Sequence, residues 1–208
     1  MQKLLFALAS ALFIFTTSCD QAGSRRDLEN GTIQGELYTN EEIGWSMTVP
    51  DDWDIISKDV LEEKTERGND IVAESMDMEI DYGGLRHLIN FQHDESNLFQ
   101  SNIEPFVVEY EGEWSENNKL IYGLLYDTFT YQGLGVDTVT YAAKVDGLSF
   151  EVLHITLYSE DGEVALNEVV YSKLINGYSF TALIIYTNEE DEETLMEIWN
   201  SSEFTIRD

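Results

Sequence analysis

The sequence predicts an α+β domain in which an antiparallel sheet ends in a C-terminal β-meander and helices pack on both faces of the sheet. The first observation is that the pairs Asp146-Gly147 and Asn176-Gly177 separate long strand-like segments. Such pairs mark two-residue hairpins because both residues tolerate positive φ. The second observation is that the last of these segments is apolar on both faces. A strand of that kind needs cover on both sides.

The meander contains four predicted strands, joined by three tight turns. We expect the strands over 136–145, 148–158, 164–175 and 178–187, with the middle turn at 159–163. In the last strand, Phe180, Ala182, Ile184 and Tyr186 give one face an apolar character. Leu183 and Ile185 make the other face apolar as well. This pattern is the reason to expect helices above and below the sheet.

Two elements are expected near the start of the domain. Residues 44–56 alternate between apolar and polar side chains, which predicts a strand that ends at Pro50. A short helix is expected over 57–68, because Ser57 can cap its start and Gly68 can end it.

A further hairpin is predicted over 76–93, with the Gly-Gly pair at 83–84 as its turn. With this turn, apolar side chains lie opposite apolar side chains at every pair except the one that contains His87. On the polar face, Asp81 lies opposite Arg86, which is an attractive cross-strand pair.

Two helices complete the predicted domain, and residues 94–114 are expected to form a loop that includes an extended piece. The first helix is expected over 115–129, with an apolar stripe formed by Leu120, Ile121, Leu124, Leu125 and Phe129. The second is expected within 187–204, where Asn188 can cap the start. The acidic run at 189–193 suits the first turn because the helix dipole favours negative charge there. The alternative interpretation of this run is a metal-binding acidic cluster.

The first 18 residues resemble a secretory signal: Lys3 precedes a short apolar run, and small residues follow it. The apolar run is shorter than the roughly 20 residues that a transmembrane helix needs. Cys19 comes directly after this segment and is the only cysteine in the chain. The stretch is similar to a bacterial lipoprotein signal, which makes Cys19 the predicted site of lipid attachment. The alternative is an ordinary cleaved signal with an incidental cysteine.

These features predict three parts: a signal peptide at 1–18, a flexible tether at 19–34 that starts at the lipidated cysteine, and a single domain at 35–208. The tether is polar and has no apolar period. The expected location is the cell envelope, with the protein anchored to a membrane through its N-terminal lipid on an outer-membrane, periplasmic or surface face.

The composition is strongly acidic, with 11 Lys and Arg against 41 Asp and Glu and a net charge of −30. Nucleic acid is therefore excluded as an expected partner, because phosphate binding needs a basic surface. The acidity has two interpretations. Either it serves a function, the binding of a basic partner or of divalent cations, or it only keeps the protein soluble in a salty environment.

The sequence contains no convincing catalytic motif. The segments around Ser46 and Ser149 lack the second glycine of a nucleophile elbow, and 77–88 lacks the glycine and glutamate of a calcium loop. His93, with Asp94 and Glu95, is the candidate for a metal-binding loop.

The other candidates are expected to be structural. His87 is expected to be a satisfied core residue, and His154 belongs to no recognisable set. The four tryptophans are expected in packing. The eleven tyrosines leave room for an exposed aromatic patch. We therefore expect no catalytic residue, no metal ligand and no cofactor.

Several segments together resemble the PsbP-like domains of bacterial lipoproteins. They are "YTNEEIGWSMTVPDDW" at 38–53, "LINFQHDESNLFQSNIEPF" at 88–106, "KVDGLSF" at 144–150 and the segment 176–204. The resemblance implies an α-β-α sandwich around an antiparallel sheet. It also implies an accessory or adaptor role, since the family shares an architecture more than a site. No functional residue carries over.

The expected function is that of a lipid-anchored cell-envelope protein that acts as a non-enzymatic binding or accessory module for an unknown envelope protein or glycan. This hypothesis predicts an apolar or aromatic contact patch on an otherwise acidic surface. The alternative is a divalent-cation-responsive binding protein that uses clustered carboxylates, with calcium as the expected cation. A hydrolase is a remote alternative.

Overall fold

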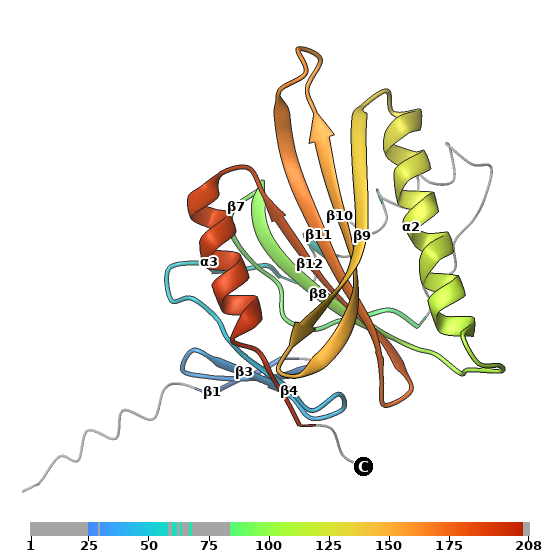
Figure 1. Ribbon diagram of the computed structural model, residues 1–208. Coiled ribbons are helices and arrows are strands. Elements are labelled where there is room, and N and C mark those ends of the chain that lie inside the picture. Colours follow the sequence, from blue (N-terminus) through green and yellow to red (C-terminus); the bar gives the residue numbers. More distant parts are fainter. Residues whose placement is uncertain are drawn as a thin grey trace, which may run out of the picture.

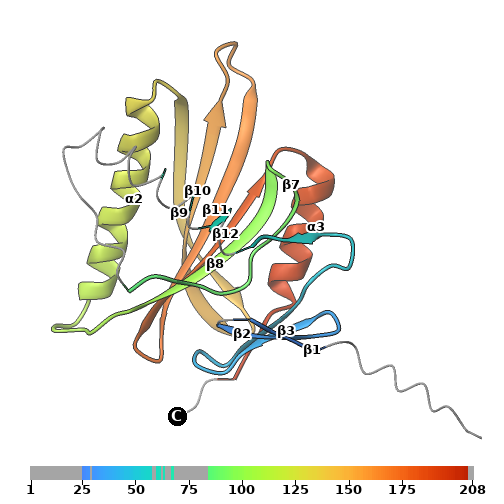
Figure 2. The same ribbon diagram turned by 180° about the vertical axis from the view of Figure 1, so that it is seen from behind.

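The computed structural model describes residues 25–28, 30–57, 60–61, 63, 67 and 84–205. The described strands form two antiparallel sheets, and two long helices pack against the larger one (Figures 1 and 2). None of the described helices is both long enough and apolar enough to cross a bilayer.

The larger sheet has eight strands in the order β5-β7-β8-β12-β11-β10-β9, with β6 paired to β8. The strands of its first half are β5 (Asp54–Ile55), β6 (Arg86–His87), β7 (Phe91–Asp94) and β8 (Asn97–Pro105). The meander forms the second half as β9 (Gly135–Val145), β10 (Leu148–Tyr158), β11 (Val164–Ile175) and β12 (Tyr178–Tyr186). The strand β9 therefore lies at one edge of the sheet.

The meander agrees with the prediction because its turns are determined locally. Asp146 and Gly147 have φ of 47° and 78°, and Asn176 and Gly177 have φ of 51° and 80°. Positive φ at both central residues is the geometry of a type I′ hairpin, whose twist matches that of the paired strands. The predicted strand bounds differ from the observed ones by no more than one residue at any end.

The smaller sheet brings the two ends of the described chain together. Its strands are β1 (Arg25–Leu28), β2 (Gly31–Gln34), β3 (Leu37–Asn40), β4 (Trp45–Thr48) and β13 (Glu203–Phe204), in that spatial order. The strands β1 and β2 fall within the tether predicted at 19–34, so ordered structure begins before the predicted boundary at residue 35. Ile33 is buried in the core, which explains why this polar stretch is held in place.

The helix α3 (Glu189–Asn200) packs on one side of the large sheet, where its contacts are with β12, β8 and β4. The Asn188 side chain accepts a hydrogen bond from the Asp191 backbone amide at 2.9 Å, which confirms the predicted cap. Leu195 and Trp199 enter a core of stacked and edge-on aromatic rings that belong to both sheets: Trp45, Phe99, Phe150, Tyr171, Phe180 and Phe204.

The helix α2 (Glu113–Tyr131) packs on the opposite side, where Tyr122 meets alternate residues of β10 such as Leu153 and Ile155. The predicted helix is confirmed, but its predicted apolar stripe is partly wrong. Leu120 is 73% exposed and Ile121 is 44% exposed. Polar contacts determine which side of α2 faces the sheet. The Ser115 and Asn118 side chains both donate to the Glu151 carboxylate on β10, so Asn118 is buried in place of Leu120 and Ile121.

The strand β8 lies where the sequence predicts a loop with an extended piece. Its inward side includes Ser101, whose hydroxyl donates to the Ile89 carbonyl at 2.6 Å and accepts from the Ile89 amide at 3.1 Å. A buried polar residue satisfied by a neighbouring segment interrupts the apolar alternation that would identify a strand.

Two other predictions are only partly within the described residues. Val60, Leu61, Glu63 and Arg67 are helical, in agreement with the helix expected over 57–68. Residues 76–83 of the predicted glycine hairpin lie outside the described residues, and so does Asp81. Arg86 forms an ion pair with Glu42 at 2.7 Å and lies over the Tyr178 ring, 5.3 Å from its centroid.

Candidate functional site

The side of the meander that carries α3 is only partly covered by that helix. The register aligns Val139 with His154 and Val169 across β9, β10 and β11, and it aligns Tyr141 with Val152 and Tyr171. The neighbouring rows add Asn167 and Tyr186 to the same side. We use the name tyrosine face for six of these side chains: Val139, Tyr141, His154, Asn167, Tyr171 and Tyr186.

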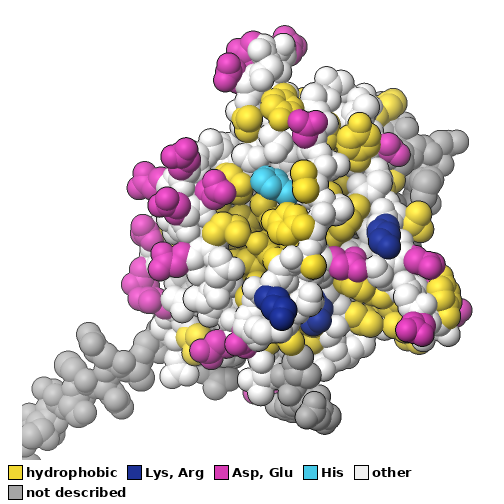
Figure 3. Space-filling model, in the orientation of Figure 1, with side chains coloured by type: hydrophobic (Ala, Val, Ile, Leu, Met, Phe, Trp, Pro, Cys, Tyr) yellow, Lys and Arg dark blue, Asp and Glu magenta, His cyan; other side chains and the backbone are white. Residues whose placement is uncertain are grey.

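The tyrosine face combines an exposed rim with a buried floor. Val139 is 60% exposed and Tyr141 is 44% exposed, whereas Tyr171 and Tyr186 are buried. Figure 3 shows apolar side chains gathered around a histidine on this side of the molecule, and acidic side chains gathered on the side where α3 lies. A contiguous apolar patch with a polar rim is typical of a contact surface.

Hydrogen bonds hold the polar members of the tyrosine face in place. His154 Nε2 lies 3.2 Å from Asn167 Oδ1, and the Thr156 hydroxyl donates to the same oxygen at 3.0 Å. Because an amide oxygen only accepts, Nε2 donates, and in a neutral ring Nδ1 is then an acceptor. The Tyr186 hydroxyl donates to Glu192 on α3 at 3.1 Å. The face therefore has a defined polar pattern.

The phenol groups of the tyrosine face stay neutral over the physiological pH range. Burial raises the pKa of Tyr141 above its usual value. Burial also raises the pKa of Tyr171, with a further contribution from the Tyr141 hydroxyl. For Tyr186, burial is again the main cause of the raised pKa, followed by the charge of Glu192. Neutral phenols keep their O–H donors, and the Tyr186 donor is already used by Glu192. For binding, the face therefore offers the exposed Tyr141 phenol, the half-buried imidazole of His154 and aromatic area.

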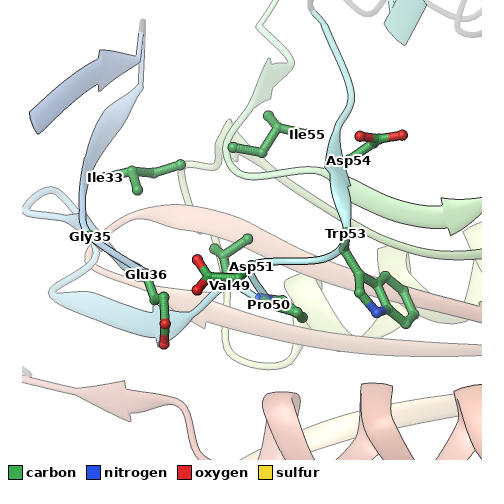
Figure 4. A pocket seen from close by; sticks show the side chains of 9 residues that line it. All are labelled: Ile33, Gly35, Glu36, Val49, Pro50, Asp51, Trp53, Asp54 and Ile55. Atoms are coloured by element: carbon green, nitrogen blue, oxygen red, sulfur yellow. The ribbon is translucent and has the colours of Figure 1, made fainter. Parts of the chain in front are cut away.

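A second feature is an acidic cleft of about 410 Å³ at the junction of the small sheet and β5. It is lined by Glu36, Asp51 and Asp54 together with apolar residues, and Figure 4 shows Asp54 pointing away from the other two carboxylates. A hydrogen bond from Asp51 and its negative charge raise the pKa of Glu36. Two adjacent carboxylates are a partial ligand set for calcium, which takes six to eight oxygens.

The candidate group at His93, Asp94 and Glu95 has a different composition in the structure. His93 and Asp94 come together with Asp191 of α3, and their ligand atoms lie within 4.8 Å of one another, whereas Glu95 is not part of this group. His93 Nδ1 lies 2.9 Å from Asp191 Oδ1, and the His93 ring stacks on Trp53. The sequence separation of 98 residues between His93 and Asp191 explains why the pair could not be predicted.

These three groups already have structural hydrogen bonds. The Asp94 carboxylate accepts from the Ser96 and Asn97 backbone amides and from the Asn97 side chain. Asp191 accepts from the Asn188 side chain at 2.6 Å. The group therefore joins the β7–β8 turn to the start of α3.

The remaining predicted residues have simpler outcomes. His87 is half-buried on β6, and its backbone carbonyl accepts a hydrogen bond from the Asn30 side chain at 2.8 Å. His154, which the sequence assigned to no set, is a member of the tyrosine face. The only signal for that face was the alternation within the meander, and alternation does not show which half of a sheet a helix covers. Cys19 lies outside the described residues.

Comparisons with known proteins concern the fold. No family model matches this chain, and no curated protein matches it. The solution structure of cyanobacterial PsbP (CyanoP) from Synechocystis sp. PCC 6803 is similar, with a TM-score of 0.52 and 12% sequence identity over 81% of this chain and 91% of that chain. At this identity the similarity shows the fold alone. The chain is thus an α+β protein with a PsbP-like fold, as its sequence resemblance implied.

Proposed function

We propose that this chain is a lipid-anchored cell-envelope lipoprotein that acts as a non-enzymatic binding or accessory module, and that the tyrosine face is its contact surface. The observation that carries the proposal is the exposed aromatic and apolar area of Val139 and Tyr141 on a chain of net charge −30. Single exposed apolar side chains are normal, but a contiguous apolar patch indicates a contact surface, and Val139 and Tyr141 lie side by side on the same face of β9. The proposal includes the finer description of the domain as an α-β-α sandwich.

The anchor in this proposal is the lipidated Cys19, which follows a signal peptide at 1–18. The tether predicted at 19–34 ends earlier than expected on its domain side, because β1 begins at Arg25. The partner is an envelope protein or a glycan, and nucleic acid is not a partner. The Cys19→Ala variant should leave the membrane fraction for the soluble fraction. Retention of that variant in the membrane would remove the anchoring part of the proposal.

Crosslinking in intact cells, followed by mass spectrometry, tests the binding part. The variant Tyr141→Ser removes an exposed ring of the tyrosine face and its interaction with the Tyr171 hydroxyl, and it keeps the buried rings of Tyr171 and Tyr186. The matched control is Tyr131→Ser, because Tyr131 at the end of α2 is 62% exposed and lies outside the face. The main crosslinked partner should be lost in Tyr141→Ser and kept in Tyr131→Ser. Equal crosslinking of the two variants would contradict the proposed surface.

The second candidate function is a divalent-cation-responsive module, and one observation favours it. Glu36 and Asp51 line the same cleft, and Asp51, through a hydrogen bond and its negative charge, raises the pKa of Glu36. A divalent cation between the two carboxylates would offset their mutual repulsion.

A further inference from the structure

Among the strands that the structure describes, β9 forms a long edge of the large sheet. It has 11 residues, whereas the other strands at the ends of the two described sheets are short: β5 and β13 have two residues each and β1 has four. Natural proteins protect edges with short strands, proline, bulges or charges. In β9 the central residues 138–143 include no charge and no proline, and only Asp137 and Lys144 are charged.

The hairpin determines which backbone groups of β9 point outward. Its two-residue turn makes Val145 and Leu148 the closing hydrogen-bonded pair, and bonded and non-bonded pairs then alternate along the ladder. The odd-numbered residues of β9 bond to β10. The N–H and C=O groups that point away from the sheet belong to Val136, Thr138, Thr140, Ala142 and Lys144.

Nothing in the described part of the chain covers this edge. No backbone or side-chain hydrogen bond from the described residues reaches these five outward groups. The side chains of Thr138, Thr140 and Ala142 are exposed, so α2 does not close over them although it packs nearby. The edge is also continuous with the tyrosine face, because Val139 and Tyr141 are β9 residues whose side chains lie on that face.

The charge of the molecule determines the chemistry of an occupant. A second copy would bring another net charge of −30 to the edge, and like charges repel. At the Gly135 end of the edge lie Asp137 on β9 and the acidic turn at 159–163, whereas Lys144 lies at the other end, so the attraction for a basic segment is strongest along the first half of β9. A polypeptide that carries lysine or arginine is attracted by the same field.

We propose that the free edge of β9 binds an extended, lysine- or arginine-bearing polypeptide segment as an added strand, with alternate side chains of the segment on the tyrosine face. This inference rests on the proposed function and specifies its partner. Main-chain hydrogen bonds from the outward groups of β9 supply the binding, and contacts with Val139 and Tyr141 supply selectivity.

The test uses a labelled decapeptide of alternating threonine and valine or lysine, with three lysines, and a counterpart in which glutamate replaces each lysine. Binding is measured by fluorescence anisotropy to the whole chain. In Thr140→Pro an outward N–H is lost while the ladder to β10 is kept, because proline is tolerated where the N–H faces solvent. Thr140→Ala is the matched control and keeps the N–H.

The expected result is that wild type and Thr140→Ala bind the basic peptide, that Thr140→Pro binds it at least tenfold more weakly, and that added salt weakens binding. Hydrogen exchange on the unmodified protein gives a second readout, independent of the folding of any variant. The basic peptide should slow exchange at Val136, Thr138, Thr140, Ala142 and Lys144, and it should leave the odd-numbered amides of β9 unchanged.

Four outcomes would overturn the inference: no binding of the basic peptide, equal binding of the acidic peptide, unchanged exchange at the outward amides, or self-association of the chain through β9. Crosslinking of the two variants in intact cells distinguishes failure of this inference from failure of the proposed function. If Tyr141→Ser loses its crosslinked partner and Thr140→Pro keeps it, the tyrosine face binds without strand addition. If both variants keep the partner, the proposed function fails as well.

Discussion

The ring of Phe204 lies stacked on the ring of Trp45, with 6.3 Å between centroids and 12° between planes. Trp45 is on β4 and Phe204 is on β13, so this contact joins the last described strand to the small sheet. The Phe204 amide also donates to the Asp146 carboxylate at 2.7 Å, which connects the same strand to the first turn of the meander. The end of the described chain is therefore part of the core.

Truncation of the Phe204 side chain should destabilise the whole domain. We expect Phe204→Ala to lower the free energy of unfolding by about 3 kcal/mol, because it removes a buried ring from an aromatic cluster. Glu203→Ala, at the exposed neighbour on the same strand, is the control and should change it by less than about 0.5 kcal/mol. Urea unfolding followed by tryptophan fluorescence measures both. Equal values for the two variants would show that β13 does not contribute to the core.

A side chain at Gly44 should be poorly tolerated. Gly44 has φ of +62°, and a Cβ there would lie 2.0 Å from the Thr205 carbonyl oxygen. The control is Gly35, which has nearly the same φ of +64° but no atom within 4 Å of its Cβ position. We expect Gly35→Ala to cost about 1 kcal/mol from backbone strain and Gly44→Ala to cost at least about 2 kcal/mol more. Thermal melts of the two variants test this difference, and similar melting temperatures would contradict it.

The carboxyl group of Glu168 should make stability depend on pH. Glu168 is on β11 between Ile155 and Ile185, and burial raises its pKa to about 7 from 4.5. Because the folded pKa is above the unfolded one, its stabilising contribution is complete below pH 4.5 and is lost as pH rises to about 7. The size of this pKa shift limits the loss of stability to about 3 kcal/mol. Because the Glu168 side chain is only half-buried, the measured loss should be smaller.

The variant Glu168→Gln should lack this loss, so its free energy of unfolding should rise relative to wild type between pH 4.5 and pH 7 and stay level above that. Glu163→Gln, at an exposed position just before β11, is the control and should follow wild type. Urea titrations at several pH values measure the difference. A constant gap between Glu168→Gln and wild type across this window would show that the carboxyl is not desolvated.

The cation hypothesis predicts a calcium-specific effect. Calcium should raise the melting temperature by more than sodium chloride of matched ionic strength does, and Glu36→Gln should remove the excess because Glu36 and Asp51 supply adjacent carboxylates. Glu160→Gln, at an exposed turn, should keep the excess. If the two salts give equal shifts, only screening of the acidic surface is present, and the cation hypothesis fails.

Prediction from sequence succeeded where short stretches of chain determine the geometry. The turns at Asp146-Gly147 and Asn176-Gly177 and the cap at Asn188 depend on neighbouring residues alone, so the meander and α3 were predicted correctly. Prediction failed where a distant group satisfies a buried polar side chain. Ser101 bonds to the Ile89 backbone, so a polar residue interrupts the apolar alternation that would have identified β8. Asn118 bonds to Glu151, so a polar residue of α2 faces the sheet where the apolar stripe was expected.

Composition, periodicity and turn residues were enough to predict an acidic α+β chain with a meander, because these signals act over a few residues. The candidate site needed long-range packing. The helix α3 docks on β12 and β8, away from β9, and pairing across four strands assembles the tyrosine face from residues between Val139 and Tyr186. Which surfaces a helix leaves open depends on where it docks, and docking depends on contacts between residues far apart in the chain.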